Sequence, residues 1–185
     1  MEDVLSLVLT VRDEVVKIAV NGWVEDSREM PKRYFVMNCF DETVAFLGLI
    51  LGAFFAGFLS PKIVLASLVN AGFAMAVSSF TVAFLVEGAE AARILELVKS
   101  RLSGGLASTF IVRLRRFNRG HVFRSAFANG FSALISTMLT SLPYLLSLYG
   151  FSTVVDAFYL SIIIVTILLL ILGFLLGRIA GGRSP

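Results

Sequence analysis

Residues 33–59 read RYFVMNCFDETVAFLGLILGAFFAGFL, and this stretch decides the fold. Its second part, Thr43–Leu59, is an apolar run that approaches the ~20 residues needed to cross a bilayer as a helix. Its first part places Asn38, Asp41 and Glu42 at the mouth of that run. Positions i, i+3 and i+4 share one helix face, so one amide and two carboxylates are expected to point the same way. An ionisable residue at membrane depth is costly, which makes this face a candidate functional site.

The composition of the whole chain indicates a membrane protein. The chain has 185 residues, of which 57% are hydrophobic, and its mean hydropathy is +0.88. Soluble domains use only about 45–50% apolar residues. Four runs are long enough to cross a membrane, at about residues 36–59, 63–86, 125–148 and 155–177. The sequence therefore predicts an all-α, polytopic membrane helical bundle with four transmembrane helices.

The segments outside these runs predict helices of another kind. Apolar and polar residues of 2–24 alternate with a helical period, which is typical of an amphipathic helix at a membrane surface. No cleavable signal peptide is expected, because Glu2 and Asp3 replace a basic start. The segment between spans 2 and 3 predicts two helices broken at residues 103–105, of which the second is a basic surface helix. The expected parts are a surface helix and connector (1–32), a transmembrane hairpin (33–86), a cytoplasmic basic segment (87–124), and spans 3 and 4 with a short tail (125–185).

Lysine and arginine predict the orientation. Fifteen of the 16 Lys and Arg residues fall on one side of the four expected spans, and only Lys62 falls on the other. The positive-inside rule then predicts a cell-membrane protein with both termini in the cytoplasm. The basic residues follow the membrane side, so membrane lipid is an expected partner and nucleic acid is not.

Small residues recur at helical spacing in the first two spans. Gly48, Gly52 and Ala56 stand four residues apart in span 1, and Gly72 and Ala76 do so in span 2. Such rows let two helices approach closely. For span 1 the pattern leaves open whether the partner is span 2 or a second subunit; we expect a homodimer.

Carboxylates from two separate segments are expected to meet. Span 1 starts, and span 2 ends, on the predicted cytoplasmic side, so Asp41, Glu42, Glu87 and Glu90 are expected at one depth. The alternative is that they are solvated helix ends paired with arginines such as Arg93. Oxygen ligands suit hard divalent cations. The residues that we single out as candidate metal ligands are Asp41, Glu42, Glu87, Glu90, Asn38 and Met37. Carboxylates also bind protons, so the cluster could exchange protons for metal.

Other chemistry finds little support in the sequence. No serine or cysteine nucleophile comes with a plausible base, because the single histidine, His121, is expected to be an interfacial side chain among arginines. No phosphate-binding loop and no Cys-x-x-Cys motif is present. We therefore expect neither an enzyme nor an ATP-driven pump, and no bound cofactor.

Several short patterns resemble the vacuolar iron transporter family, in particular its short archaeal members. Asp41 matches the aspartate that begins the family's first span, although Glu42 stands where the family has glycine. Glu87 and Glu90 match the acidic end of its second span. Leu142-Pro143-Tyr144-Leu145 is similar to its proline-bearing third span. The resemblance covers about residues 33–180, with four expected spans where the family has a fifth.

This resemblance implies a dimer that moves ferrous iron or manganese out of the cytosol in exchange for protons. It implies that Asp41 is the metal and proton site within the membrane, and that Glu87 and Glu90 belong to the cytoplasmic entry. The metal is then a transported substrate. The alternative function is a non-transporting membrane protein of the same fold that acts in interaction or assembly.

Overall fold

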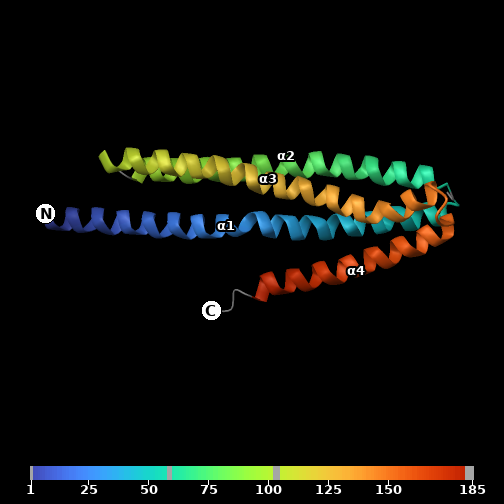
Figure 1. The fold of residues 1–185 in the computed structure, drawn as a ribbon. Coiled ribbons are helices and arrows are strands. Elements are labelled where there is room, and N and C mark those ends of the chain that lie inside the picture. Colours follow the sequence, from blue (N-terminus) through green and yellow to red (C-terminus); the bar gives the residue numbers. More distant parts are fainter. Residues whose placement is uncertain (1, 58–59, 102–104, 182–185) are drawn as a thin grey trace. The chain divides into compact units, whose positions relative to one another are not determined.

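The protein is built from long helices (Figure 1), as the computed structural model shows for residues 2–57, 60–101 and 105–181. Its helices are α1 (Glu2–Phe55), α2 (Pro61–Arg101), α3 (Gly105–Leu148) and α4 (Val154–Gly181), and no strand occurs within those ranges. All four contain a stretch long and apolar enough to cross a membrane, and these stretches have 34, 40, 35 and 26 residues. The prediction of an all-α membrane helical bundle is confirmed.

Helix α1 continues through the segment that the sequence predicts as a connector. The helix has 54 residues and contains Pro31, so a break before span 1 is wrong. The residues around Pro31, which include Glu, Arg and Met, are good helix formers. A polar segment of this composition can therefore remain helical. Proline lacks the N–H that would bond to the Ser27 carbonyl, and its ring crowds that carbonyl, which together cost about 3 kcal/mol; α1 nevertheless continues through it. The predicted amphipathic faces of residues 2–21 lie outside the side chains that the structure describes.

Helices α2 and α3 each join a predicted span to a predicted cytoplasmic helix without interruption. Helix α2 has 41 residues and α3 has 44, which is longer than a membrane crossing requires. Helix α2 ends at Arg101 and α3 begins at Gly105, and the predicted break at residues 103–105 falls mostly outside the described residues.

The chain divides into two compact units. Residues 1–31 and 82–126 form one, which we call the three-helix unit because α1, α2 and α3 contribute to it. Residues 32–81 and 127–185 form the other, the four-helix unit. These boundaries lie close to those predicted between the transmembrane spans and the segments that flank them.

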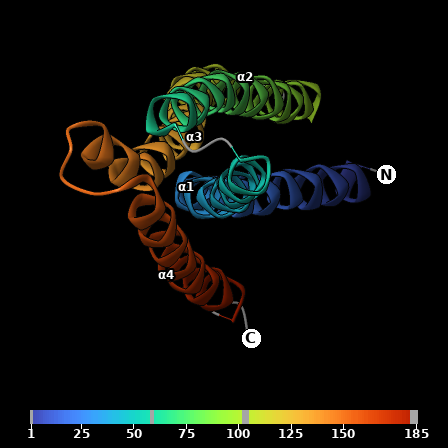
Figure 2. The same ribbon diagram turned by 90° about the vertical axis from the view of Figure 1, so that its right-hand side faces the viewer.

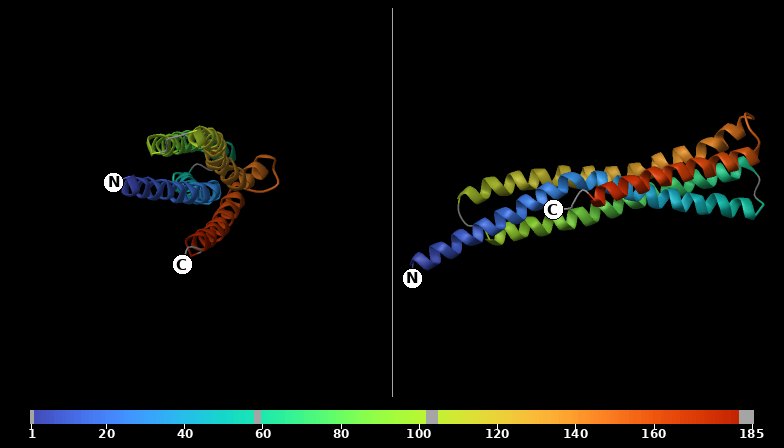
Figure 3. Two further views of the ribbon diagram at one scale, coloured as in Figure 1. Left: turned by 90° about the vertical axis from the view of Figure 1, so that its left-hand side faces the viewer. Right: turned by 90° about the horizontal axis from the view of Figure 1, so that it is seen from below.

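The core of the four-helix unit draws on every helix. Phe46 and Ile50 from α1 are almost fully buried, and α4 lies alongside α1 and α3 in this unit (Figure 3). The Phe54 and Phe158 rings stack with their centroids 3.8 Å apart, which joins α1 to α4. The buried core consists of Phe46, Ile50, Val64, Leu68, Tyr144, Ala157, Phe158 and Val165.

Helices α2 and α3 lie side by side in the four-helix unit (Figure 2), and glycine permits their close approach. A Cβ at Gly130 would lie 2.8 Å from the Ala76 carbonyl oxygen. A Cβ at Gly72 would lie 1.8 Å from Thr137 Oγ1. The small-residue row of span 2 is thus a contact with α3. By contrast, a Cβ at Gly48 would meet nothing within 4 Å, so the structure shows no such contact for the row of span 1.

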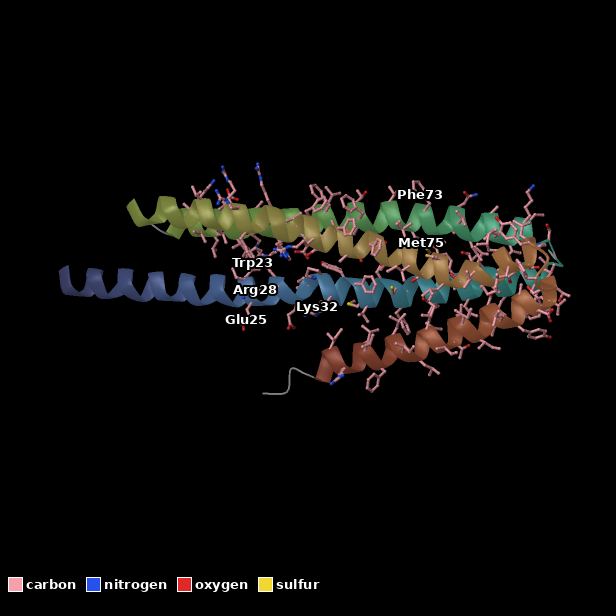
Figure 4. The ribbon with its side chains drawn as sticks, in the orientation of Figure 1. Trp23, Glu25, Arg28, Lys32, Phe73 and Met75 are labelled. Atoms are coloured by element: carbon pink, nitrogen blue, oxygen red, sulfur yellow. The ribbon has the colours of Figure 1, made fainter. Side chains whose placement is uncertain are left out.

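The three-helix unit has a smaller core. Val98 and Leu114 are buried, and Trp23 packs against them from α1. The Trp23 and Phe117 rings meet edge to face at 5.9 Å. Figure 4 shows Trp23 turned towards α2 and α3, while Glu25 projects away from them.

Candidate functional site

Helix α3 turns a polar stripe towards the other helices and apolar residues outwards. The stripe recurs every three or four residues, which keeps it on one helix face. Its members are all buried: Ser125, Asn129, Ser132, Ser136 and Thr140. The opposite side exposes large apolar residues such as Phe127, Phe131, Leu134 and Met138. A polar interior behind an apolar surface is the arrangement expected of a helix that borders a polar path in a membrane.

The side-chain amide of Asn38 connects three helices of the four-helix unit. Its Nδ2 lies 2.6 Å from Glu42 Oε1, 2.8 Å from the Asn129 carbonyl oxygen and 2.8 Å from Ser132 Oγ. Its Oδ1 accepts a hydrogen bond from Ser79 Oγ at 3.3 Å. We call these five residues, Asn38, Glu42, Ser79, Asn129 and Ser132, the polar cluster.

Further hydrogen bonds hold the cluster together. Asn129 Nδ2 donates to the Ser79 carbonyl oxygen at 2.9 Å, which ties α3 to α2. The buried thiol of Cys39 donates to the Ser132 carbonyl oxygen at 3.6 Å, which ties α1 to α3. The cluster is therefore built from side chains and backbone groups that already constrain one another.

Glu42 is the acidic member of the polar cluster. Its side chain lies in the interior, since the residue is only 3% exposed. Oε1 accepts from Asn38, whereas Oε2 is buried without a hydrogen-bond partner among the described residues. A buried polar atom left without a partner is costly and calls for an explanation. A cation at Oε2 would satisfy it, and a proton there would remove the charge that makes burial so costly.

Asp41 and Met37 lie elsewhere on α1. Both are exposed, whereas Cys39, Glu42 and Thr43 are buried. The expectation that Asn38, Asp41 and Glu42 all point the same way is therefore wrong for Asp41. Adjacent residues on a helix differ by 100° in direction, and the packed side of α1 runs through Glu42.

Glu87 belongs to the three-helix unit, where it binds a histidine. His121 Nε2 lies 2.6 Å from Glu87 Oε2, and both residues are buried. His121 Nδ1 lies 3.5 Å from Ser125 Oγ, and the Phe117 ring stacks on the imidazole at 6.2 Å. The expectation that His121 is an interfacial side chain among arginines is wrong, because the residue is only 2% exposed and its ring nitrogen bonds to Glu87 inside the unit.

Glu90 lies at the surface of the same unit. Its carboxylate is 3.6 Å from Arg93 Nη1, one turn further along α2, and its side chain is 43% exposed. Exposed ion pairs contribute only ~0–1 kcal/mol to stability. For Glu90 this geometry favours the alternative of a solvated, paired carboxylate.

Of the six predicted ligands, the structure brings Asn38 and Glu42 together. Throughout the described ranges, no three His, Cys, Asp or Glu side chains gather closely enough to hold a metal ion. Ser79, Asn129 and Ser132 were not predicted as members of the site, although the spacing of Asn129 and Ser132 along α3 indicated a polar face. No family model, curated protein or solved structure matches this chain.

Proposed function

We propose that this protein transports a divalent cation, ferrous iron or manganese, through its four-helix unit in exchange for protons. The observation that supports this most directly is Glu42, a buried carboxyl whose Oε2 lacks a partner within a polar cluster. Ionisable groups inside membrane helices are expensive and commonly mark ion paths or proton relays. A purely structural core has no use for an unsatisfied carboxyl oxygen.

The cluster offers oxygen donors of the kind that hard cations prefer. They are the Glu42 carboxylate, the Asn38 amide oxygen, the Ser79 and Ser132 hydroxyls, and the Asn129 carbonyl. Carbonyl, carboxylate and hydroxyl oxygens suit magnesium, manganese and comparable divalent ions better than soft metals. A carboxyl that accepts either a cation or a proton in the same place provides the exchange that an antiporter requires.

The resemblance to vacuolar iron transporters adds roles for three further carboxylates. In this proposal Asp41 lies next to Glu42 along the path, and Glu87 and Glu90 serve cytoplasmic entry. The open face at Gly48 and Gly52 supports assembly as a homodimer, because small residues on an uncovered face permit close helix contact.

Metal flux into proteoliposomes tests this proposal. Wild-type protein should carry ferrous iron or manganese and should respond to a pH gradient. Glu42→Gln keeps the shape of the side chain and its bond to Asn38, but removes the titratable charge, so flux should fall on the order of tenfold or more. Glu96→Gln is the matched control, because Glu96 is exposed, and it should transport normally.

Asp41→Asn then distinguishes the two adjacent carboxylates. If Glu42 is the site, Asp41→Asn should reduce flux less than Glu42→Gln does. The reverse ranking would assign the site to Asp41, as the family resemblance implies. If wild type carries neither metal, or if both variants carry them as well as wild type, transport is wrong and the interaction or assembly function takes its place.

A further inference from the structure

A cavity of about 380 Å³ lies between α1 and α3 of the three-helix unit. Ser27, Arg28 and Pro31 line it from α1, and Phe117, His121 and Arg124 line it from α3. No Asp or Glu is among these described lining residues. Pro31 cannot donate to the Ser27 carbonyl, so the α1 backbone lacks a helical hydrogen bond beside the cavity. The proposed cation path does not use this cavity.

Two guanidinium groups reach the cavity from different helices. Arg124 Nε donates to the Gly120 carbonyl oxygen at 3.1 Å, which orients the side chain and leaves its terminal nitrogens for another acceptor. A Cβ at Gly120 would lie 3.8 Å from Arg124 Nη2, so the side chain lies back over Gly120. No described carboxylate pairs with Arg28 or Arg124.

The remaining lining residues give the cavity one apolar side. Phe117 and Pro31 are partly buried, and His121 is already engaged by Glu87. The volume falls within the ~300–1,000 Å³ of small-molecule sites, which leaves room for an organic part beside an anionic group. Two arginine forks match the charge and the several acceptor oxygens of a phosphate better than a single carboxylate does.

We propose that this cavity binds a phosphate ester. Arg28 and Arg124 hold the phosphate from opposite helices, while Phe117 and Pro31 contact the organic part. The bound phosphate ester is either the headgroup of an anionic phospholipid or a soluble molecule. Both present a negatively charged phosphate next to an organic group.

The only tryptophan of the chain is a built-in reporter for this cavity. Trp23 lies 5.9 Å from the rings of Phe117 and His121, which both line the cavity, and it shares a stretch of α1 with Arg28 (Figure 4). Tryptophan emission of the full-length protein in phosphatidylcholine nanodiscs should therefore change saturably when glycerol 3-phosphate is added. In a second arm, phosphatidylglycerol is incorporated into the nanodiscs and the emission is compared with that in phosphatidylcholine alone.

Substitutions of the two arginines test the assignment. Arg28→Gln and Arg124→Gln should each weaken the response at least about tenfold, because each removes a charge-assisted contact. Both side chains are exposed, so the helices should form normally, which circular dichroism checks. Arg28→Lys keeps the charge without the planar fork and should lose part of the affinity. Arg116→Gln removes an exposed arginine of α3 that does not line the cavity, and it should bind as wild type.

The two arms identify the source of the phosphate. A saturable response to glycerol 3-phosphate that depends on both arginines assigns a soluble ester. A response to phosphatidylglycerol alone, with the same dependence, assigns a lipid headgroup. No response in either arm overturns the proposal, and so does an Arg116→Gln variant that weakens binding as much as Arg28→Gln.

Discussion

Asn38 is the residue on which the polar cluster depends. A side-chain amide has two N–H groups, yet three acceptors lie within 2.8 Å of Asn38 Nδ2. The same amide accepts from Ser79 through Oδ1. One side chain therefore satisfies polar atoms on α1, α2 and α3, and its loss would strand several of them in the interior.

Asn38→Ala should destabilise the protein. Leaving buried partners without a hydrogen bond costs about 1–3 kcal/mol, so the apparent unfolding temperature in detergent should fall. Asn70→Ala is the matched control, because Asn70 lies in an apolar stretch of α2 but is exposed. It should unfold close to the wild-type temperature, and equal losses in both variants would show that the cluster does not stabilise the fold.

Adjacent carboxylates on α1 show how much one residue step matters. Asp41 and Glu42 are chemically alike, yet Asp41 is exposed and Glu42 is 3% exposed. The charge and hydropathy of the two side chains do not predict which one is buried. Only the direction in which α1 packs, through Cys39 and Phe46, distinguishes them.

At the scale of the elements, the contact between α2 and α3 in the four-helix unit leaves no room for an added Cβ at Gly72 or Gly130. Gly130 faces the backbone of α2, since an added Cβ would lie 2.8 Å from the Ala76 carbonyl oxygen. A backbone atom cannot rotate away as a side chain can. Gly130 is therefore required for the distance at which the polar stripe of α3 meets Ser79.

Gly130→Ala should force the two helices apart. We expect a loss of about 1–3 kcal/mol, the usual effect of overpacking a tight contact, measured as a lower apparent unfolding temperature. Gly173→Ala on α4 is the matched control, because a Cβ there meets nothing within 4 Å. That variant should be unchanged or slightly more stable, since alanine favours a helix by up to about 1 kcal/mol over glycine. A stable Gly130→Ala protein would contradict the packing described here.

At the scale of the whole molecule, the orientation in the membrane is the property that the charges predict. Four helices are long enough to cross, and Lys62 stands alone on its side of the expected spans. Fifteen basic residues on the opposite side predict that this side, with both termini, faces the cytoplasm.

Cysteine labelling tests the orientation. Single cysteines at Lys62 and at Ser100, both exposed, should react with a membrane-impermeant reagent from opposite faces in a background where Cys39 is replaced by serine. The cysteine at position 100 should react with the reagent only after the membrane has been permeabilised. Labelling of both positions from one face in intact cells would exclude the predicted topology.

The sequence by itself determined the fold class and the four apolar stretches long enough to cross a membrane, because both follow from local properties. Apolar runs of sufficient length predict spans wherever they occur in the chain. The sequence also pointed to Asn38 and Glu42, since an amide and a carboxylate four residues apart must share a helix face. It was wrong about the connector before span 1, because polar helix-forming residues there continue α1 without a break.

Only the tertiary structure decided which polar groups meet. It buried Glu42 and exposed Asp41, paired His121 with Glu87, and brought Ser79, Asn129 and Ser132 to Asn38. The paired residues stand 34 to 94 positions apart in the chain. Helical periodicity does not predict which helix faces will contact one another. Their meeting depends on the rotation and spacing of packed helices, which residues such as Gly72 and Gly130 set through steric contact. Helical periodicity describes one helix at a time, and burial is a property of several helices together.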